Sequence, residues 1–156
     1  MISLALVLAL QAATPPPAAN PGANPGSSPS SNPGPGPLGA IGKQTLPAKG
    51  CAAYLWSMDA GRLLVAMATA EPAQIRLAID GKTADYAMTT QSPAIGFGFG
   101  GVTQYRGGDV TATLDMAVAV RADISAGATV TSATLRIDRP GRDTVVMPVG
   151  GLIGCV

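Results

Sequence analysis

The clearest pattern in the chain is a strict alternation of apolar and polar positions over residues 109–124. Every even position of this stretch is apolar, whereas six of its odd positions carry charged or hydroxyl side chains: Asp109, Thr111, Thr113, Asp115, Arg121 and Asp123. Successive side chains of a strand point to opposite faces, so this period predicts a strand with one buried face and one solvated face. The stretch is longer than a typical strand, which predicts a bend or bulge near residues 117–119.

Shorter segments repeat the same pattern along the rest of the chain. We expect strands at the following residues: 52–56, 62–68, 75–79, 82–90, 131–137 and 143–149. Asp80-Gly81 and the run from Arg139 to Arg142 supply turn signals between them. Because Pro148 has no backbone donor, the last strand is expected to be an edge strand or to end there. Good helix formers leave a local helix as the alternative for residues 63–71.

This spacing of strands and turns predicts a mainly β domain over residues 40–156. About eight short strands without a sustained helical period are typical of an antiparallel sandwich or barrel. Of the two, we take the antiparallel β-sandwich, jelly-roll-like in topology, as the prediction.

The N-terminal part has the composition of exported proteins. Residues 2–10 are apolar apart from Ser3, and small residues follow, which predicts a secretory signal peptide over residues 1–13. Pro15 ends the apolar run before the roughly 20 residues of a membrane span, so no span is expected after cleavage. Residues 14–39 are rich in Pro, Gly, Asn and Ser and cannot bury enough apolar surface to fold, which predicts a disordered tail. We therefore expect a periplasmic or secreted protein.

The only two cysteines, Cys51 and Cys155, bracket the predicted domain. In an exported chain, two cysteines are most simply one disulfide, which here would join the first and last strands. Two free thiols are the alternative. A redox pair is less favoured, because catalytic cysteines usually lie two residues apart.

Charge and composition exclude several functions. The chain has 10 basic and 9 acidic residues and a net charge of +1, without a basic stripe, so we expect no nucleic-acid binding. It has no histidine, which excludes His-dependent catalytic triads, and paired cysteines would leave little to bind zinc. We therefore expect no catalytic residues, no metal and no cofactor.

Two weaker candidate sites can be set aside on their context. Residues 96–101 contain three spaced glycines, as in dinucleotide-binding loops, but a strand rather than a helix follows, so we interpret them as a flexible or bulged edge. Asp115 and Asp123 share the polar face of the predicted strand but would lie roughly 26 Å apart, too far for the paired carboxylates of a glycosidase.

The aromatic residues are the candidates for ligand binding. Tyr54 and Trp56 share one strand face, opposite the face of Cys51, Ala53 and Leu55. If the cysteine face is buried, both rings point outward, where they would stack on a ligand such as a sugar ring. Further candidates are Phe97, Phe99 and Tyr105. The alternative is that these rings belong to the core or cover the sheet.

Residues 126–137 contain the pattern G-x-x-V-x-x-A-x-L, running from Gly127 to Leu135. This segment resembles the start of a core strand in carbohydrate-binding jelly-roll modules of extracellular enzymes. The matching residues are structural ones, so the resemblance implies a fold more than a function. The whole domain also resembles small exported proteins of alphaproteobacterial type, which implies export and supplies no activity.

These observations lead to one main hypothesis and two alternatives. We expect an exported, non-enzymatic binding or cell-envelope-associated domain whose partner is an envelope protein or polysaccharide. The first alternative is a carbohydrate-binding module that uses exposed aromatic rings. A histidine-free hydrolase is the less favoured second alternative.

Overall fold

A computed structural model describes residues 37–156 of the chain. The predicted signal peptide, and all of the predicted tail before Pro37, lie outside the described residues. The described part contains no helix with the length and apolar character of a membrane span. Its strands are β1 (Leu38–Gly39), β2 (Cys51–Ser57), β3 (Leu64–Ala70), β4 (Ala73–Ile79), β5 (Lys82–Gln91), β6 (Ala94–Gly96), β7 (Phe99–Gly100), β8 (Val102–Gly107), β9 (Val110–Ala119), β10 (Gly127–Asp138) and β11 (Val145–Cys155).

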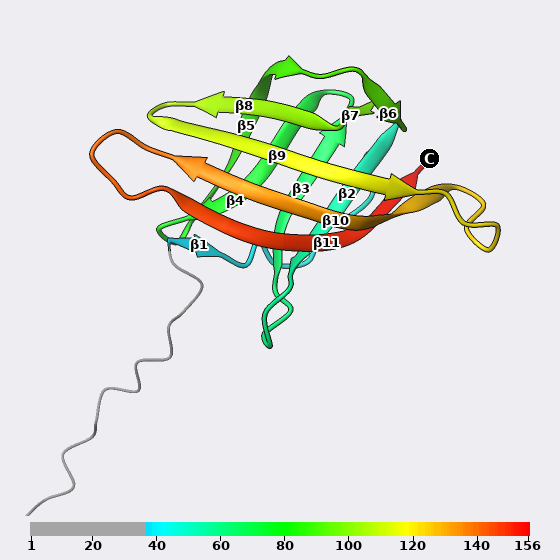
Figure 1. Cartoon of the computed structure of the whole chain (residues 1–156), viewed down its shortest axis with the longest axis horizontal. Coiled ribbons are helices and arrows are strands. Elements are labelled where there is room, and N and C mark those ends of the chain that lie inside the picture. Colours follow the sequence, from blue (N-terminus) through cyan, green and yellow to red (C-terminus); the bar gives the residue numbers. More distant parts are fainter. Residues whose placement is uncertain (1–36) are drawn as a thin grey trace, which may run out of the picture. The chain divides into compact units, whose positions relative to one another are not determined.

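Eight of these strands form a closed antiparallel barrel (Figure 1). In chain order, β2, β3, β4, β5, β8, β9, β10 and β11 each pair with the next, and β11 pairs back with β2. The predicted β-sandwich is therefore wrong. A sandwich keeps two sheets with free edges, whereas here the β4–β5 and β2–β11 pairings close one sheet on itself. Both architectures bury alternate residues, so the alternation in sequence did not separate them.

The predicted disulfide is confirmed, and it lies where the barrel closes. Cys51 and Cys155 are directly opposite each other in the β2–β11 pair, with a sulfur–sulfur distance of 2.03 Å. The covalent bond therefore joins the first and last strands of the barrel.

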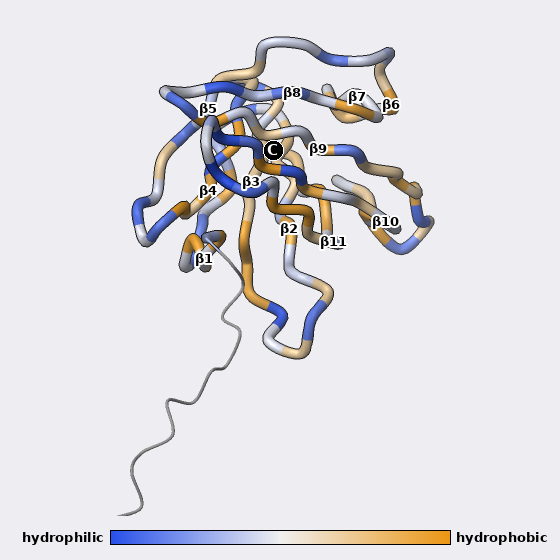
Figure 2. Tube along the Cα trace, turned by 60° about the vertical axis from the view of Figure 1, so that its left-hand side comes forward, coloured by the Kyte–Doolittle hydropathy of each residue, from blue (hydrophilic) through white to orange (hydrophobic). Residues whose placement is uncertain are grey.

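Apolar side chains fill the interior of the barrel. Its largest fully buried side chains include Leu55, Leu77, Leu114, Leu135 and Tyr105. Figure 2 shows the corresponding apolar stretches, among them much of β11. The interior is thus a packed core, as expected for a barrel of eight strands.

The alternative helix at residues 63–71 is wrong, because Leu64–Ala70 forms β3 between β2 and β4. The side chains of Val65, Ala66 and Ala68 enter the core, and this pairing and burial outweigh helix propensity.

The predicted long strand is shorter than its sequence pattern. β9 ends at Ala119, and the chain then turns, with Ile124 N–H donating to the Arg121 carbonyl at 3.1 Å. The predicted irregularity does occur opposite residues 117–118, but the extra residue, Thr131, belongs to the partner strand β10.

Two further sequence predictions concern turns and the last strand. The Asp80-Gly81 turn is confirmed, with positive φ values of 50° and 77° at its two residues. The prediction for Pro148 is wrong, since β11 continues through it to Cys155. At Pro148 the strand already pairs with Thr134 of β10, and it pairs with β2 from Val149 onward.

A short hairpin of β6 and β7 lies at the barrel end near the disulfide. Its tip, Gly96 to Gly98, has positive φ values, and Phe99 inserts into the barrel core with 2% of its surface exposed. The close approach of the tip to β3 requires glycine at position 98, because a Cβ there would lie 2.7 Å from the Ala70 Cβ. The segment predicted as a flexible or bulged edge therefore helps to cover one end of the barrel.

A charged cluster covers the opposite end of the barrel. The Arg139 side chain, 19% exposed, lies between two carboxylates, 2.6 Å from Asp80 Oδ2 and 3.3 Å from Asp109 Oδ2. The guanidinium group lowers the pKa of Asp80. These contacts tie together the β4–β5, β8–β9 and β10–β11 turns.

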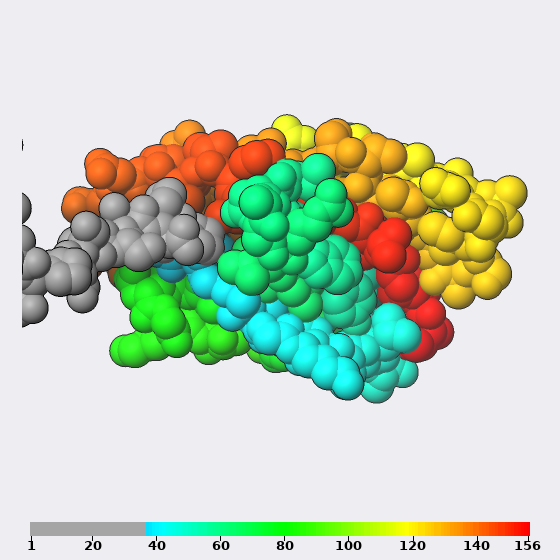
Figure 3. Space-filling view, turned by 90° about the horizontal axis from the view of Figure 1, so that it is seen from below, coloured from blue at the N-terminus to red at the C-terminus, as the bar shows by residue number. Residues whose placement is uncertain are grey.

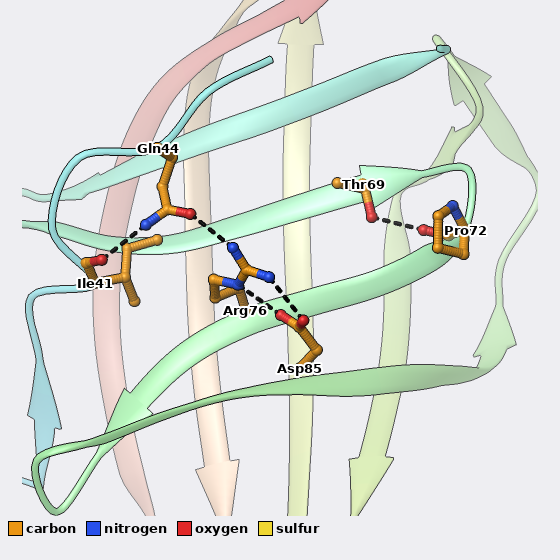
Figure 4. Close-up of polar contacts among 6 residues, drawn as sticks. All are labelled: Ile41, Gln44, Thr69, Pro72, Arg76 and Asp85. Atoms are coloured by element: carbon orange, nitrogen blue, oxygen red, sulfur yellow. Dashed lines mark hydrogen bonds and ion pairs between the residues drawn. The ribbon is translucent and has the colours of Figure 1, made fainter. Parts of the chain in front are cut away.

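Residues 40–50, which we call the strap, cross the outer face of β2, β3 and β4. Ile41 of the strap is buried there against Ala52, Met67 and Ala78, outside the barrel core. Gln44 Oε1 accepts a hydrogen bond of 3.0 Å from Arg76, which also holds Asp85 through two hydrogen bonds (Figure 4). β1, which lies in the predicted tail, pairs with β4 just before the strap.

Candidate functional site

Tyr54 and Trp56 point outward from β2, as the sequence predicts, but their surroundings differ. The Tyr54 hydroxyl donates a hydrogen bond of 2.9 Å to the Thr45 carbonyl of the strap, and its ring packs with the outer apolar cluster. Partial burial raises the pKa of Tyr54. Tyr54 is therefore engaged by the chain itself, while half-buried Trp56 lines an open hollow next to it.

We call this hollow the Trp56 groove. It lies on the outer face of the barrel, where β2, β11 and β10 are neighbours, and has a volume of about 500 Å³. Its lining residues are Trp56, Ser57, Met58, Arg62, Thr129, Val130, Thr131, Gly150, Gly151 and Leu152. An aromatic ring, aliphatic side chains, two threonine hydroxyls and one guanidinium group thus meet in a single concave surface.

Two glycines of β11 form the floor of the Trp56 groove. Gly150 is the register partner of Trp56, and a Cβ at this position would lie 3.0 Å from the Met58 sulfur. A Cβ at Gly151 would collide with the Tyr54 carbonyl oxygen, so the backbones of β2 and β11 approach each other closely only because residue 151 is glycine. The Met58 thioether therefore lies over Gly150, in the space that a side chain of residue 150 would take.

The β2–β3 loop, residues 58–63, forms one wall of the Trp56 groove and stands out from this face in Figure 3. Buried Ser57 donates a hydrogen bond of 2.8 Å to Asp59 Oδ1 and accepts one of 3.0 Å from the Leu63 N–H. Asp59 Oδ1 also accepts a hydrogen bond of 3.0 Å from the Gly61 N–H. These bonds fix the loop, which presents Arg62 with a positive φ of 42°.

The other three aromatic candidates do not share this surface. Phe99 and Tyr105 are 2% and 1% exposed inside the barrel, and Phe97 is partly buried against the same core. Burial raises the pKa of Tyr105 to about 12. The structure therefore separates Trp56 from Phe97, Phe99 and Tyr105 and gives the latter three packing positions.

The carboxylates of the described residues are dispersed over the surface. Six of the nine acidic residues form ion pairs: Glu71, Asp80, Asp85, Asp109, Asp123 and Asp138. Within residues 37–156, three or more potential ligands of a metal ion do not gather anywhere. Asp115 and Asp123 do not form a pair, because Asp123 lies in the β9–β10 loop and binds Arg121 instead.

Sequence reasoning found Trp56 but missed its neighbours in the groove. The available signal was the Gly150-Gly151 pair inside an apolar strand, since glycine within a strand often marks a close approach of two backbones. Which strand lies beside β11, and hence that the two glycines adjoin Trp56, depends on the closure of the barrel.

Comparison of the chain with family models, with curated proteins and with solved structures finds no match.

Proposed function

We propose that this domain is a non-enzymatic binding module of the periplasm or cell exterior, and that it binds a polysaccharide in the Trp56 groove. The observation that carries this proposal is the position of Trp56, half-buried beside a floor of two glycines and fixed next to a hydrogen-bonded loop.

The chemistry of the groove suits a sugar ring. The C–H face of a pyranose packs on the face of an indole ring, and the exposed Met58 thioether over Gly150 adds an adaptable apolar surface next to Trp56. Thr129, Thr131 and Arg62 supply hydrogen-bonding groups at the rim. Binding sites commonly combine an apolar surface with a few polar groups that fix the orientation of the ligand.

Two features support binding rather than catalysis. The chain has no histidine, and most of its carboxylates are held in ion pairs at separate places on the surface. Of the carboxylates, none lines the Trp56 groove. A bound sugar would therefore meet no pair of carboxylates of the kind that glycoside hydrolysis requires.

The compartment is part of the proposal. The Cys51–Cys155 disulfide is consistent with an oxidising space, and the apolar segment at residues 2–10 supports export.

An envelope protein is the second candidate partner. It is favoured by the exposed apolar side chains that line the groove, where Met58 and Leu152 are 63% and 48% exposed. Clusters of exposed apolar side chains often mark protein contacts.

Affinity electrophoresis and binding to insoluble polysaccharides test the proposal. We expect cellulose, chitin, xylan or peptidoglycan to retard or retain the wild-type domain, and soluble fragments to change the fluorescence of Trp56, the only tryptophan of the chain. Trp56→Ala should abolish retention. The control Val102→Ala, which shortens an exposed side chain on β8 outside the groove, should leave it unchanged.

Failure of all four polysaccharides to retain the wild type would contradict the polysaccharide proposal. Retention that survives in Trp56→Ala would contradict the site. Capture of one defined envelope protein, lost in Trp56→Ala without any saccharide binding, would favour the second candidate.

A further inference from the structure

A second hollow lies on the outer face of the barrel beside the Trp56 groove. It has a volume of about 400 Å³, and its lining residues are Asp115, Met116, Ala117, Ser132, Ala133, Thr134 and Pro148. It lies over β9, β10 and β11, whereas the Trp56 groove lies over β2, β11 and β10. The two hollows therefore share the two middle strands.

The β-bulge of β10 is the point where the two hollows meet. Thr131 lines the Trp56 groove, and the next residue, Ser132, lines the second hollow; both side chains are exposed. The register of β10 with β11 shifts between Val130 and Ala133, opposite Gly150. Residue 150 has no side chain, and the exposed Met58 thioether of the β2–β3 loop lies over it, so a chain that occupies both hollows passes along Met58.

The combined surface is long and crosses the strands. From β2 through β11 and β10 to β9 there are three inter-strand steps, or about 14 Å at the usual spacing of antiparallel strands. A pyranose ring is about as long as one such step, so the surface would hold about three consecutive sugar units. The rim is rich in hydroxyl groups throughout, from Thr129 and Thr131 to Ser132 and Thr134.

Closure of the barrel disfavours an extended peptide as the occupant. Peptides commonly bind β-sheets by adding a strand at a free edge, where backbone N–H and C=O groups are available. Here β2, β11, β10 and β9 are each paired on both sides, so their backbone groups along this face already have partners. A chain that lies across the strands must instead bind to side chains, as a saccharide does.

We propose that the ligand is a linear polysaccharide which crosses four strands and occupies both hollows at once, with one ring on Trp56, one near Met58 and Ser132, and one near Ala117. This inference rests on the proposed function and adds the length and direction of the bound chain. Its consequence is that affinity depends on chain length up to the number of units that fill both hollows.

The test compares oligosaccharides of graded length, from the monosaccharide to the hexasaccharide, by titration of Trp56 fluorescence. Cello- and chito-oligosaccharides are used first, together with fragments of the polysaccharide that retains the domain. We expect the affinity of the wild type to rise from the disaccharide to the trisaccharide by at least about tenfold, the gain from one to two additional net hydrogen bonds. It should then level off.

Ala117→Arg places a long side chain in the second hollow from an exposed position of β9. This variant should bind the disaccharide like the wild type but lose the gain with length. Ala87→Arg is the matched control, because Ala87 is an exposed alanine in β5, outside both hollows. It should retain the full length dependence.

The outcomes separate this inference from the proposed function. If saccharides bind at Trp56 with an affinity that does not change beyond the disaccharide, or if Ala117→Arg keeps the full gain, the two-hollow site is wrong and the binding function stands. If no saccharide binds to the wild type, both are wrong.

Discussion

Removal of the disulfide offers the sharpest test of how the barrel is stabilised. The variant is Cys51→Ser/Cys155→Ser, which leaves no free thiol in the chain. In the folded protein the two residues are already register partners at the end of the β2–β11 pair. The barrel therefore does not need the bond to bring these backbones together, and its main effect should be on the unfolded chain.

The expected loss follows from the length of the closed loop. The cysteines are separated by 104 residues. In the chain-entropy model, closing a loop of about 100 residues in the unfolded chain raises the free energy of unfolding by roughly 4.7 kcal/mol. Removing a native disulfide from a small secreted domain typically lowers that free energy by about 2–5 kcal/mol. For a folded part of this size, such a loss should lower Tm by roughly 10–20 °C.

Urea denaturation measures this loss, with Trp56 fluorescence and far-UV circular dichroism as two independent probes. The double variant should unfold at lower urea concentration than the oxidised wild type, and its m value should be larger, because its unfolded state is less compact. Wild type in reductant is the matched control and should behave like the variant, whereas reductant should leave the variant unchanged. A loss below about 0.5 kcal/mol would refute the reasoning, since it lies well under the range of measured native disulfides.

Three further predictions concern the floor of the groove, the hairpin and the core. Gly151→Ala should lower the Tm of the barrel by more than the control Gly39→Ala does. A Cβ at residue 151 would collide with the Tyr54 carbonyl oxygen, whereas a Cβ at residue 39 would make only ordinary van der Waals contacts. Equal Tm values for the two variants in thermal melts would contradict this. Phe99→Ala should lower the free energy of unfolding by about 3–5 kcal/mol, the usual cost of removing a buried phenyl ring, and an effect under 1 kcal/mol would mean that the hairpin does not pack on the core. Burial raises the pKa of Tyr105 from 10.0 to about 12, so the stability that depends on its neutral form is complete below pH 10 and is lost as the pH rises towards 12. Absorbance at alkaline pH should show Tyr105 titrating last of the three tyrosines, and three tyrosines that all titrate together near pH 10 would oppose this.

Much of the secondary structure could be predicted because it depends on neighbours along the chain. The alternation at residues 75–79 and 131–137 gave strands that the structure contains, and Asp80-Gly81 gave the turn between β4 and β5. Where a local preference disagreed with strand pairing, the pairing prevailed. Residues 64–70 favour a helix but form β3 between β2 and β4, and Pro148 lacks a backbone donor but lies inside β11. The bulge was expected near residues 117–119 but lies in β10, since a register shift belongs to a pair of strands and only one of them was considered.

The candidate site was predictable only in part. The alternation along β2 places Trp56 opposite Leu55, and this established that the ring faces outward. It did not establish that Tyr54 is engaged by the strap while Trp56 remains open, nor that Phe99 and Tyr105 are interior. Those differences come from residues distant in sequence, which sequence periodicity does not bring together.

By itself, the sequence determined which faces of the strands are apolar, where the chain turns, and that its two cysteines lie in the first and last of the long strands. The tertiary structure decided that β11 pairs with β2 to close a barrel rather than lie in an open sandwich, and with this it placed Gly150 and Gly151 beside Trp56. The physical reason is that the two-residue period of a strand fixes the direction of each side chain, whereas strand partners depend on twist, register and packing over the whole sheet. A surface site that spans several strands exists only once those partners are chosen.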